Sequence, residues 1–189
     1  MVTTARTRRT AALYGAVALV LALAGCGGGG GGDKPSAGAT AAPSLTRTTD
    51  PDAAEKAAVL DAYRAMSAAE VRTYATGKLD PDLTRYADHL ALADIKSTLF
   101  WYQQQGTVMK GEPKRTPEVT ALDTGSTPLR ATIKDCVDSS TYDKVEKDSG
   151  KAAASPSGPR RHVVTSTAKR SKTGPWKIYT STIERNRTC

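Results

Sequence analysis

The sequence is poor in aromatic residues, cysteine and histidine. Aromatic residues make up 5% of its 189 positions, with Phe100 as the single phenylalanine, and there are three cysteines and two histidines. It has no Cys-x-x-Cys pair, no metal-ligand spacing, no phosphate-binding glycine loop and no Gly-x-Ser-x-Gly elbow. Nucleic-acid-binding motifs are also missing. We therefore predict no catalytic residue, no metal ligand, no cofactor and no nucleic-acid partner.

Long apolar runs are missing too. The apolar stretch over 11–24 is shorter than the roughly 20 residues that span a bilayer. Three arginines, Arg6, Arg8 and Arg9, precede it, and small residues end it. A basic start, a short apolar centre and small residues at the end are typical of a secretory signal. We therefore predict a signal peptide over residues 1–25 and an exported protein.

The signal ends in Leu23-Ala24-Gly25-Cys26, which resembles the lipobox of bacterial lipoproteins. The resemblance implies cleavage between Gly25 and Cys26 and attachment of a diacylglycerol to the Cys26 sulfur. Two acyl chains give stable membrane attachment, whereas one gives reversible binding. We expect a lipid-anchored protein on the extracytoplasmic face of the cell membrane. The alternative is a plain secreted protein in which Cys26 is incidental.

Residues 26–49 combine this cysteine with a linker. Six glycines occupy 27–32, and Ser, Thr, Ala, Pro and Gly dominate 33–49. Such a composition predicts a flexible chain with a span of roughly 25–30 Å. Removal of the three signal-peptide arginines lowers the formal net charge from +8 to +5. This modest excess favours a solvated basic surface over a dedicated site for anionic lipid or wall polymers.

Residues 50–189 have the length of one domain. Asp-Pro pairs at 50 and 80 each predict the start of a helix. The first helix continues to about residue 76 and stops at Gly77, and a third covers 92–102 with Gly106 beyond it. The apolar positions of the first helix recur with helical spacing, at Val59, Ala62, Tyr63, Met66 and Ala69.

Aromatic residues are concentrated near the end of the third helix. Phe100, Trp101 and Tyr102 are adjacent, so they point in different directions around the helix axis. We expect them to pack in the core, with a pocket lining as the alternative. Since aliphatic residues and tyrosines must supply most of the core, Trp101 and Trp176 are expected inside it.

Short segments rich in Thr, Val and Ile follow Gly106 and predict strands at 107–110, 118–122, 130–137, 162–170 and 176–184. Lys172-Thr173-Gly174-Pro175 predicts a tight connection between the last two. The stretch 139–160 is predicted to be a long polar connection, mobile over 152–157. Helices followed by antiparallel strands indicate an α+β fold, with the helices packed on a curved antiparallel sheet.

This order resembles the cone-shaped NTF2-like (SnoaL-like) domain, which also occurs in lipoproteins of high-GC Gram-positive bacteria. The resemblance rests on the segment from Arg130 to Asp138 and on Gly174-Pro175-Trp176-Lys177-Ile178. It extends over the whole of 50–189. It implies that the sheet wraps around the long helix to form a cone.

With Cys26 assigned to lipid, Cys136 and Cys189 remain as an even pair in an oxidising compartment. We expect a disulfide between them. The alternatives are a redox, nucleophilic or metal-binding cysteine.

Three functions stay open. The preferred one is a non-catalytic module that binds a small apolar ligand or an envelope protein partner. The resemblance also implies a possible enzyme that performs acid–base chemistry on a small organic molecule, with Asp135 or Asp138 as base and a tyrosine or His89 orienting the substrate. For both aspartates, however, we favour a solvated strand end that stabilises a turn. The third is a structural or accessory role in the envelope.

Overall fold

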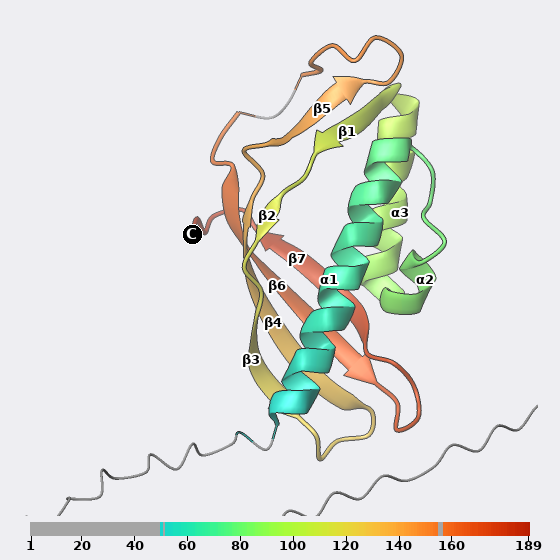
Figure 1. Cartoon of the computed structure of the whole chain (residues 1–189). Coiled ribbons are helices and arrows are strands. Elements are labelled where there is room, and N and C mark those ends of the chain that lie inside the picture. The colour runs from blue at the N-terminus through green and yellow to red at the C-terminus, as the bar shows by residue number, and fades with distance from the viewer. Residues whose placement is uncertain (1–49, 51, 155–156) are drawn as a thin grey trace, which may run out of the picture. The chain divides into compact units, whose positions relative to one another are not determined.

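The computed structural model describes residues 50, 52–154 and 157–189. The predicted signal peptide, the cleavage site at Gly25 and Cys26, and the linker lie outside these residues. Three helices come first, followed by the strands (Figure 1). Their bounds are α1 Ala53–Thr76, α2 Leu83–Tyr86, α3 His89–Gln104, β1 Thr107–Gly111, β2 Lys114–Arg115, β3 Glu118–Asp123, β4 Leu129–Asp138, β5 Tyr142–Glu146, β6 Arg161–Arg170 and β7 Lys177–Glu184.

The two Asp-Pro-Asp segments start helices, although each helix begins two residues later than predicted. In both, the first aspartate accepts a hydrogen bond from the backbone N–H of the second: Asp50 Oδ1 from Asp52 and Asp80 Oδ1 from Asp82, each at 2.9 Å. This bond forms a turn that leads the chain into the helix. Helix α1 ends as predicted, because Gly77 adopts the left-handed conformation at φ +66°.

The strands form an open antiparallel sheet with the order β2-β4-β6-β7, in which β3 also pairs with β4, and a separate ladder of β1 with β5. All five predicted strands are present, and the α+β class is confirmed. The prediction for 139–160 was wrong in part, since β5 lies within this stretch and pairs with β1 from Thr107↔Glu146 to Gly111↔Tyr142. The two-residue strand β2 was not predicted.

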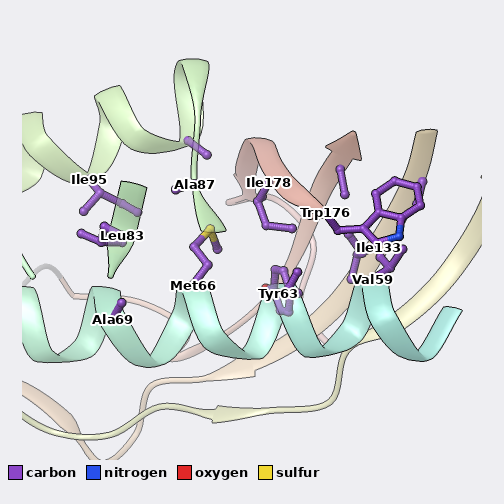
Figure 2. Close-up of a cluster of buried hydrophobic side chains, with 14 of the residues drawn as sticks. Val59, Tyr63, Met66, Ala69, Leu83, Ala87, Ile95, Ile133, Trp176 and Ile178 are labelled. Carbon is purple, nitrogen blue, oxygen red and sulfur yellow. The ribbon is translucent and has the colours of Figure 1, made fainter. Parts of the chain in front are cut away.

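Helix α1 lies along one face of the sheet and supplies much of the core (Figure 1). Its buried side chains meet those of α2, β4 and β7, as Figure 2 shows. Tyr63, Ile133 and Ile178 are each fully buried. The space between helix and sheet is therefore filled by side chains. The core members drawn in Figure 2 include Val59, Tyr63, Met66, Ala69, Leu83, Ile133, Trp176 and Ile178.

The start of α1 is fastened to the connection between β6 and β7. Glu55 Oε1 accepts a hydrogen bond from Arg170 Nη2 at 2.8 Å, and Glu55 Oε2 accepts one from Trp176 Nε1 at 3.0 Å. The Arg170 guanidinium also lies over the Trp176 ring, 5.5 Å from its centre. Trp176 is 3% exposed, which confirms its predicted place in the core.

The predicted packing of the α3 aromatic cluster was largely wrong. Phe100 is 55% exposed and Trp101 is 60% exposed, while Tyr102 packs edge-on against Tyr74 at 5.3 Å between ring centres. Buried α3 positions are Ala91, Ile95 and Leu99. Because these three recur every four residues on one face, Phe100 and Trp101 fall on the opposite side.

The disulfide between Cys136 and Cys189 is present, with Cα atoms 5.8 Å apart. It joins β4 to the last residue of the chain. The segment just before Cys189 also contacts the sheet, because the backbone N–H of Val163 in β6 donates a hydrogen bond to the carbonyl of Arg187. The C-terminal segment is therefore held at two points.

Candidate functional site

Asp135 forms the centre of a buried polar cluster beneath α1. It follows Leu129, Ala131 and Ile133 at alternate positions of β4, so its side chain lies on the same buried face of the sheet. Its Oδ2 accepts a hydrogen bond from the Tyr63 hydroxyl at 3.0 Å, and its Oδ1 accepts one from the Thr116 N–H at 2.7 Å. The expectation of a solvated strand end was therefore wrong for Asp135, which is 2% exposed.

Arg115 connects this aspartate to α1. Its Nη1 lies 3.4 Å from Asp135 Oδ2 and donates to the Tyr63 oxygen at 3.2 Å. Its Nη2 lies 3.4 Å from Glu70 Oε2. One guanidinium thus bridges two carboxylates, one from β4 and one from α1, across a largely buried space. A charge in such a place is tolerated when it is paired and hydrogen-bonded.

The environment disfavours ionisation of two members of the cluster. Burial raises the pKa of Glu70 above its ordinary value, and the nearby Arg115 only partly opposes the effect. Burial also raises the pKa of the Tyr63 hydroxyl, which Arg115 opposes and the Asp135 carboxylate reinforces. Three further tyrosines, Tyr74, Tyr102 and Tyr142, have raised pKa values, mainly because they are buried and secondly because the charge of Glu70 is near.

This arrangement is suited to holding the structure together rather than to catalysis by Asp135. Its carboxylate is enclosed and already accepts bonds from Tyr63 and Thr116, in contact with Arg115. A substrate would have to displace these groups to reach it. Glu70 is the more accessible carboxylate, with a side chain 24% exposed.

The other two candidates for acid–base chemistry lie apart from this cluster. Asp138, at the end of β4, accepts a hydrogen bond from the Ser140 N–H at 2.9 Å, so the predicted turn-stabilising role is confirmed for it. His89 is the first residue of α3, where its exposed ring stacks on Tyr179 of β7 at 6.2 Å. The structure therefore brings Asp135 together with a tyrosine, but not with Asp138 or His89.

Sequence reasoning missed Arg115 and Glu70. Glu70 follows Tyr63 by seven residues, two helical turns along the same face of α1, and this spacing is a usable signal. Arg115 lies between Pro113 and Pro117 in a segment without periodicity. Nothing local in the sequence indicates that its side chain turns inward.

Two open clefts flank α1. One, of about 270 Å³, runs along the side that carries Ser67 and Val71, with Arg115 in its wall. The other, of about 500 Å³, lies between Ala58, Ala62 and Ala65 of α1 and the Pro175-Trp176 segment. In the parts of the chain that the structure describes, no group of three or more His, Cys, Asp or Glu residues could hold a metal ion. No helix among those residues is long and apolar enough to cross a membrane.

The exposed aromatic pair on α3 is a second candidate site. The Phe100 and Trp101 rings contact each other, with their centres 6.5 Å apart. Leu90, on the same outward side of α3, is 51% exposed but lies about 15 Å further back along the helix. Contiguous apolar surface marks interaction sites, whereas single exposed apolar residues are ordinary.

Comparison with known proteins gives no family. No family model matches the chain, and no curated protein matches it. Among solved structures, the intermembrane space region of the chloroplast protein ARC6 is similar over 68% of this chain and 95% of that chain, at 13% identity and a TM-score of 0.43.

Proposed function

We propose that this protein is a lipid-anchored, extracytoplasmic lipoprotein whose NTF2-like domain binds an envelope protein partner without catalysis. Cys26 carries the anchor, residues 26–49 link it to the domain, and the outward side of α3 receives the partner. The observation that carries the proposal is the exposure of Phe100 and Trp101 over a filled core.

The filled interior favours a protein partner over a ligand held inside a cone. Tyr63, Met66 and Ile133 occupy the space between α1 and the sheet (Figure 2). Aromatic residues, tryptophan above all, supply much of the binding energy at protein interfaces. An exposed Trp101 in contact with Phe100 therefore fits a docking surface.

The position of the pair within the domain also supports a partner. Gln103, near the end of α3, donates a hydrogen bond to the carbonyl of Gly77, which follows α1. The aromatic pair is therefore at the C-terminal end of α1, whereas the predicted linker joins its N-terminal end. The 24 residues of α1 separate these ends by about 36 Å. Phe100 and Trp101 consequently lie at the end of the domain away from the predicted linker, where they are exposed to a partner.

Site-specific photo-crosslinking in cells tests the partner surface. A benzophenone amino acid at position 101 is expected to give a discrete crosslinked protein, and the additional substitution Phe100→Ser is expected to abolish it. The same amino acid at position 134 of β4, on the face of the sheet that points away from the helices, is the matched control. Equal products from both positions, or none from position 101, would overturn the docking surface.

The anchor is tested separately by fractionation. The chain with Cys26→Ser is expected to leave the membrane fraction, while the unchanged chain stays in it. If the variant remains in the membrane after its signal has been removed, lipidation at Cys26 is wrong.

A small apolar ligand is the second candidate, and the 500 Å³ cleft favours it. Alanines of α1 face Pro175 and Trp176 in this open cleft, which Asp61 and Arg170 also line. Binding of N-phenylnaphthylamine that Ala65→Trp abolishes would support this candidate. Absence of any such binding would leave the protein partner alone.

A further inference from the structure

The two sulfurs of the disulfide lie in different surroundings. Cys136 is held within β4 and is partly buried, whereas Cys189 follows the end of β7 and is exposed. Alternation along β4 places the Cys136 side chain on the outer face of the sheet, because the neighbouring Asp135 points toward the helices. A thiolate from solution can therefore approach the Cys189 sulfur more easily than the Cys136 sulfur.

A cation contacts the less accessible of the two sulfurs. Nη2 of Arg161, in β6, lies 3.5 Å from Cys136 Sγ. Arg161 stands opposite Asp138 in the ladder of β4 with β6. Asp138 accepts a hydrogen bond from the Ser140 N–H, and among the described residues no carboxylate oxygen lies within 4.0 Å of the Arg161 guanidinium. The contact with sulfur is therefore not displaced by an ion pair.

The other charges on this part of the outer face have partners of their own. Both carboxylate oxygens of Glu184 are bonded within the chain, one to a threonine hydroxyl and one to Arg187. Lys134 lies directly opposite Glu118 in the ladder of β3 with β4. Arg161 is therefore the charged side chain placed to act on the disulfide.

A positive charge beside one sulfur favours one direction of cleavage. Exchange proceeds by attack of a thiolate on one sulfur, and the other sulfur leaves with the electron pair of the broken bond. The sulfur that is more stable as a thiolate leaves faster, and a neighbouring guanidinium stabilises a thiolate. Cys136 is therefore the favoured leaving group, and the exposed Cys189 is the favoured target.

We propose that this disulfide is a site of thiol–disulfide exchange with a dithiol protein of the same compartment. A thiolate of that protein attacks Cys189 Sγ and forms a mixed disulfide, while Cys136 Sγ departs as a thiolate next to Arg161. The second thiol of the dithiol protein then loses its proton and attacks its own partner sulfur, which releases Cys189. The dithiol protein ends as a disulfide, and its two electrons and two protons end on Cys136 and Cys189.

This exchange releases one short segment of the domain. Residues 185–189 run from the end of β7 back to β4. Besides the disulfide, Arg187 holds this segment, because its carbonyl accepts a hydrogen bond from the Val163 N–H and its guanidinium pairs with Glu184. The buried cluster between α1 and the sheet contains no residue of 185–189. We therefore expect reduction to free this segment while the rest of the fold persists.

Reaction of the purified chain with reduced glutathione tests the direction of exchange. Cys26→Ser leaves Cys136 and Cys189 as the only cysteines and keeps the chain unlipidated. After acid quenching, peptide mass spectrometry is expected to find glutathione on Cys189 and a free thiol at Cys136. Glutathione mainly on Cys136, equal amounts on both, or reaction only in urea would overturn the proposal.

Two variants test the role of Arg161. Arg161→Met should slow the release of Cys136 by dithiothreitol about threefold or more, because the departing thiolate loses its cation. Arg130→Met is the matched control, since Arg130 is on the same outer face of β4 but six residues, or about 20 Å, from Cys136. It should react like the unchanged chain, and equal rates for the two variants would refute the part assigned to Arg161.

Amide hydrogen exchange on the reduced chain shows what the bond controls. The Val163 N–H is expected to exchange faster after reduction, while protection at 131–135 and the circular dichroism of the domain stay unchanged. A reduced chain that unfolds as a whole would leave the bond with a structural role alone and so contradict the proposal. None of these readouts involves position 101, so failure of the exchange site and failure of the docking surface on α3 are seen separately.

Discussion

Replacement of Arg115 by methionine removes the cation that bridges Asp135 and Glu70. The aliphatic part of the side chain is retained, so the main change is the loss of charge and of its hydrogen bonds. Asp135 then stays fully buried with only Tyr63 and Thr116 as partners. A guanidinium and a carboxylate 3.4 Å apart attract by about 5 kcal/mol at an effective dielectric constant of about 20. The desolvation of Arg115 offsets part of this attraction.

We therefore expect Arg115→Met to lower the free energy of unfolding by about 3 kcal/mol, in the range measured when one partner of a buried pair is removed. This is a large part of the stability of an ordinary domain. Urea denaturation at neutral pH, followed by circular dichroism with the disulfide intact, measures it. Arg64→Met is the matched control, because Arg64 is exposed and its ion pair with Asp61, at 3.4 Å, lies on the surface. It should change stability by no more than about 0.5 kcal/mol.

A double variant separates the loss of pairing from simple damage to packing. When Asp135→Asn accompanies Arg115→Met, no buried carboxylate is left at position 135, and the side-chain oxygen can still accept from the Thr116 N–H. At least half of the lost stability should return. The reasoning is refuted if Arg115→Met costs less than about 1 kcal/mol, or if the double variant is no more stable than the single one.

Three further predictions concern stability. Cys136→Ser with Cys189→Ser should cost about 4 kcal/mol in urea denaturation, since the bridge spans 53 residues, and a loss below about 1 kcal/mol would contradict the entropic estimate. Gly111→Ala should cost about 3 kcal/mol of stability, because φ is +90° and the added Cβ would approach the Thr141 carbonyl oxygen to 1.9 Å. Gly106→Ala is the control and should cost about 1 kcal/mol, since Gly106 has φ +62° but open space around it. Equal shifts in melting temperature for the two variants would refute this. Burial raises the pKa of Glu70 above its ordinary value of 4.5, so its stabilising contribution is complete below 4.5 and is lost as the pH rises through the folded-state pKa. Glu70→Gln should therefore raise the melting temperature relative to the unchanged chain more at pH 7 than at pH 4, and the same difference at both pH values would argue against it.

The helices were predictable because their signals are local. Apolar spacing located α1 and α3, and Gly77 marked the end of α1 through a conformation that glycine adopts readily. The aromatic cluster was misjudged although its residues were expected to point in different directions, because three adjacent residues cover too much of the helix circumference for all of them to face the core. Ala91, Ile95 and Leu99 occupy the buried face of α3.

The buried cluster was only half visible in the sequence. Alternation along β4 gave a signal for Asp135, since Ala131 and Ile133 share its side of the strand, yet a carboxylate is so rarely buried that a solvated role seemed simpler. The partner that makes burial possible, Arg115, lies 20 residues away in β2. Strand β5 was missed for a similar reason, because its pairing with β1 joins segments more than 30 residues apart. Contacts between distant segments have no periodic signature.

The double hydrogen bond of Glu55 has a mechanical consequence. The first turn of α1 is joined through this one side chain to Arg170 and Trp176, more than 100 residues further along. A pull on the N-terminal side of the domain is therefore resisted by these two hydrogen bonds to the β6–β7 connection as well as by the first turn of the helix. If the chain is tethered as proposed, the end of the domain nearest the tether is the end that this cross-link fastens.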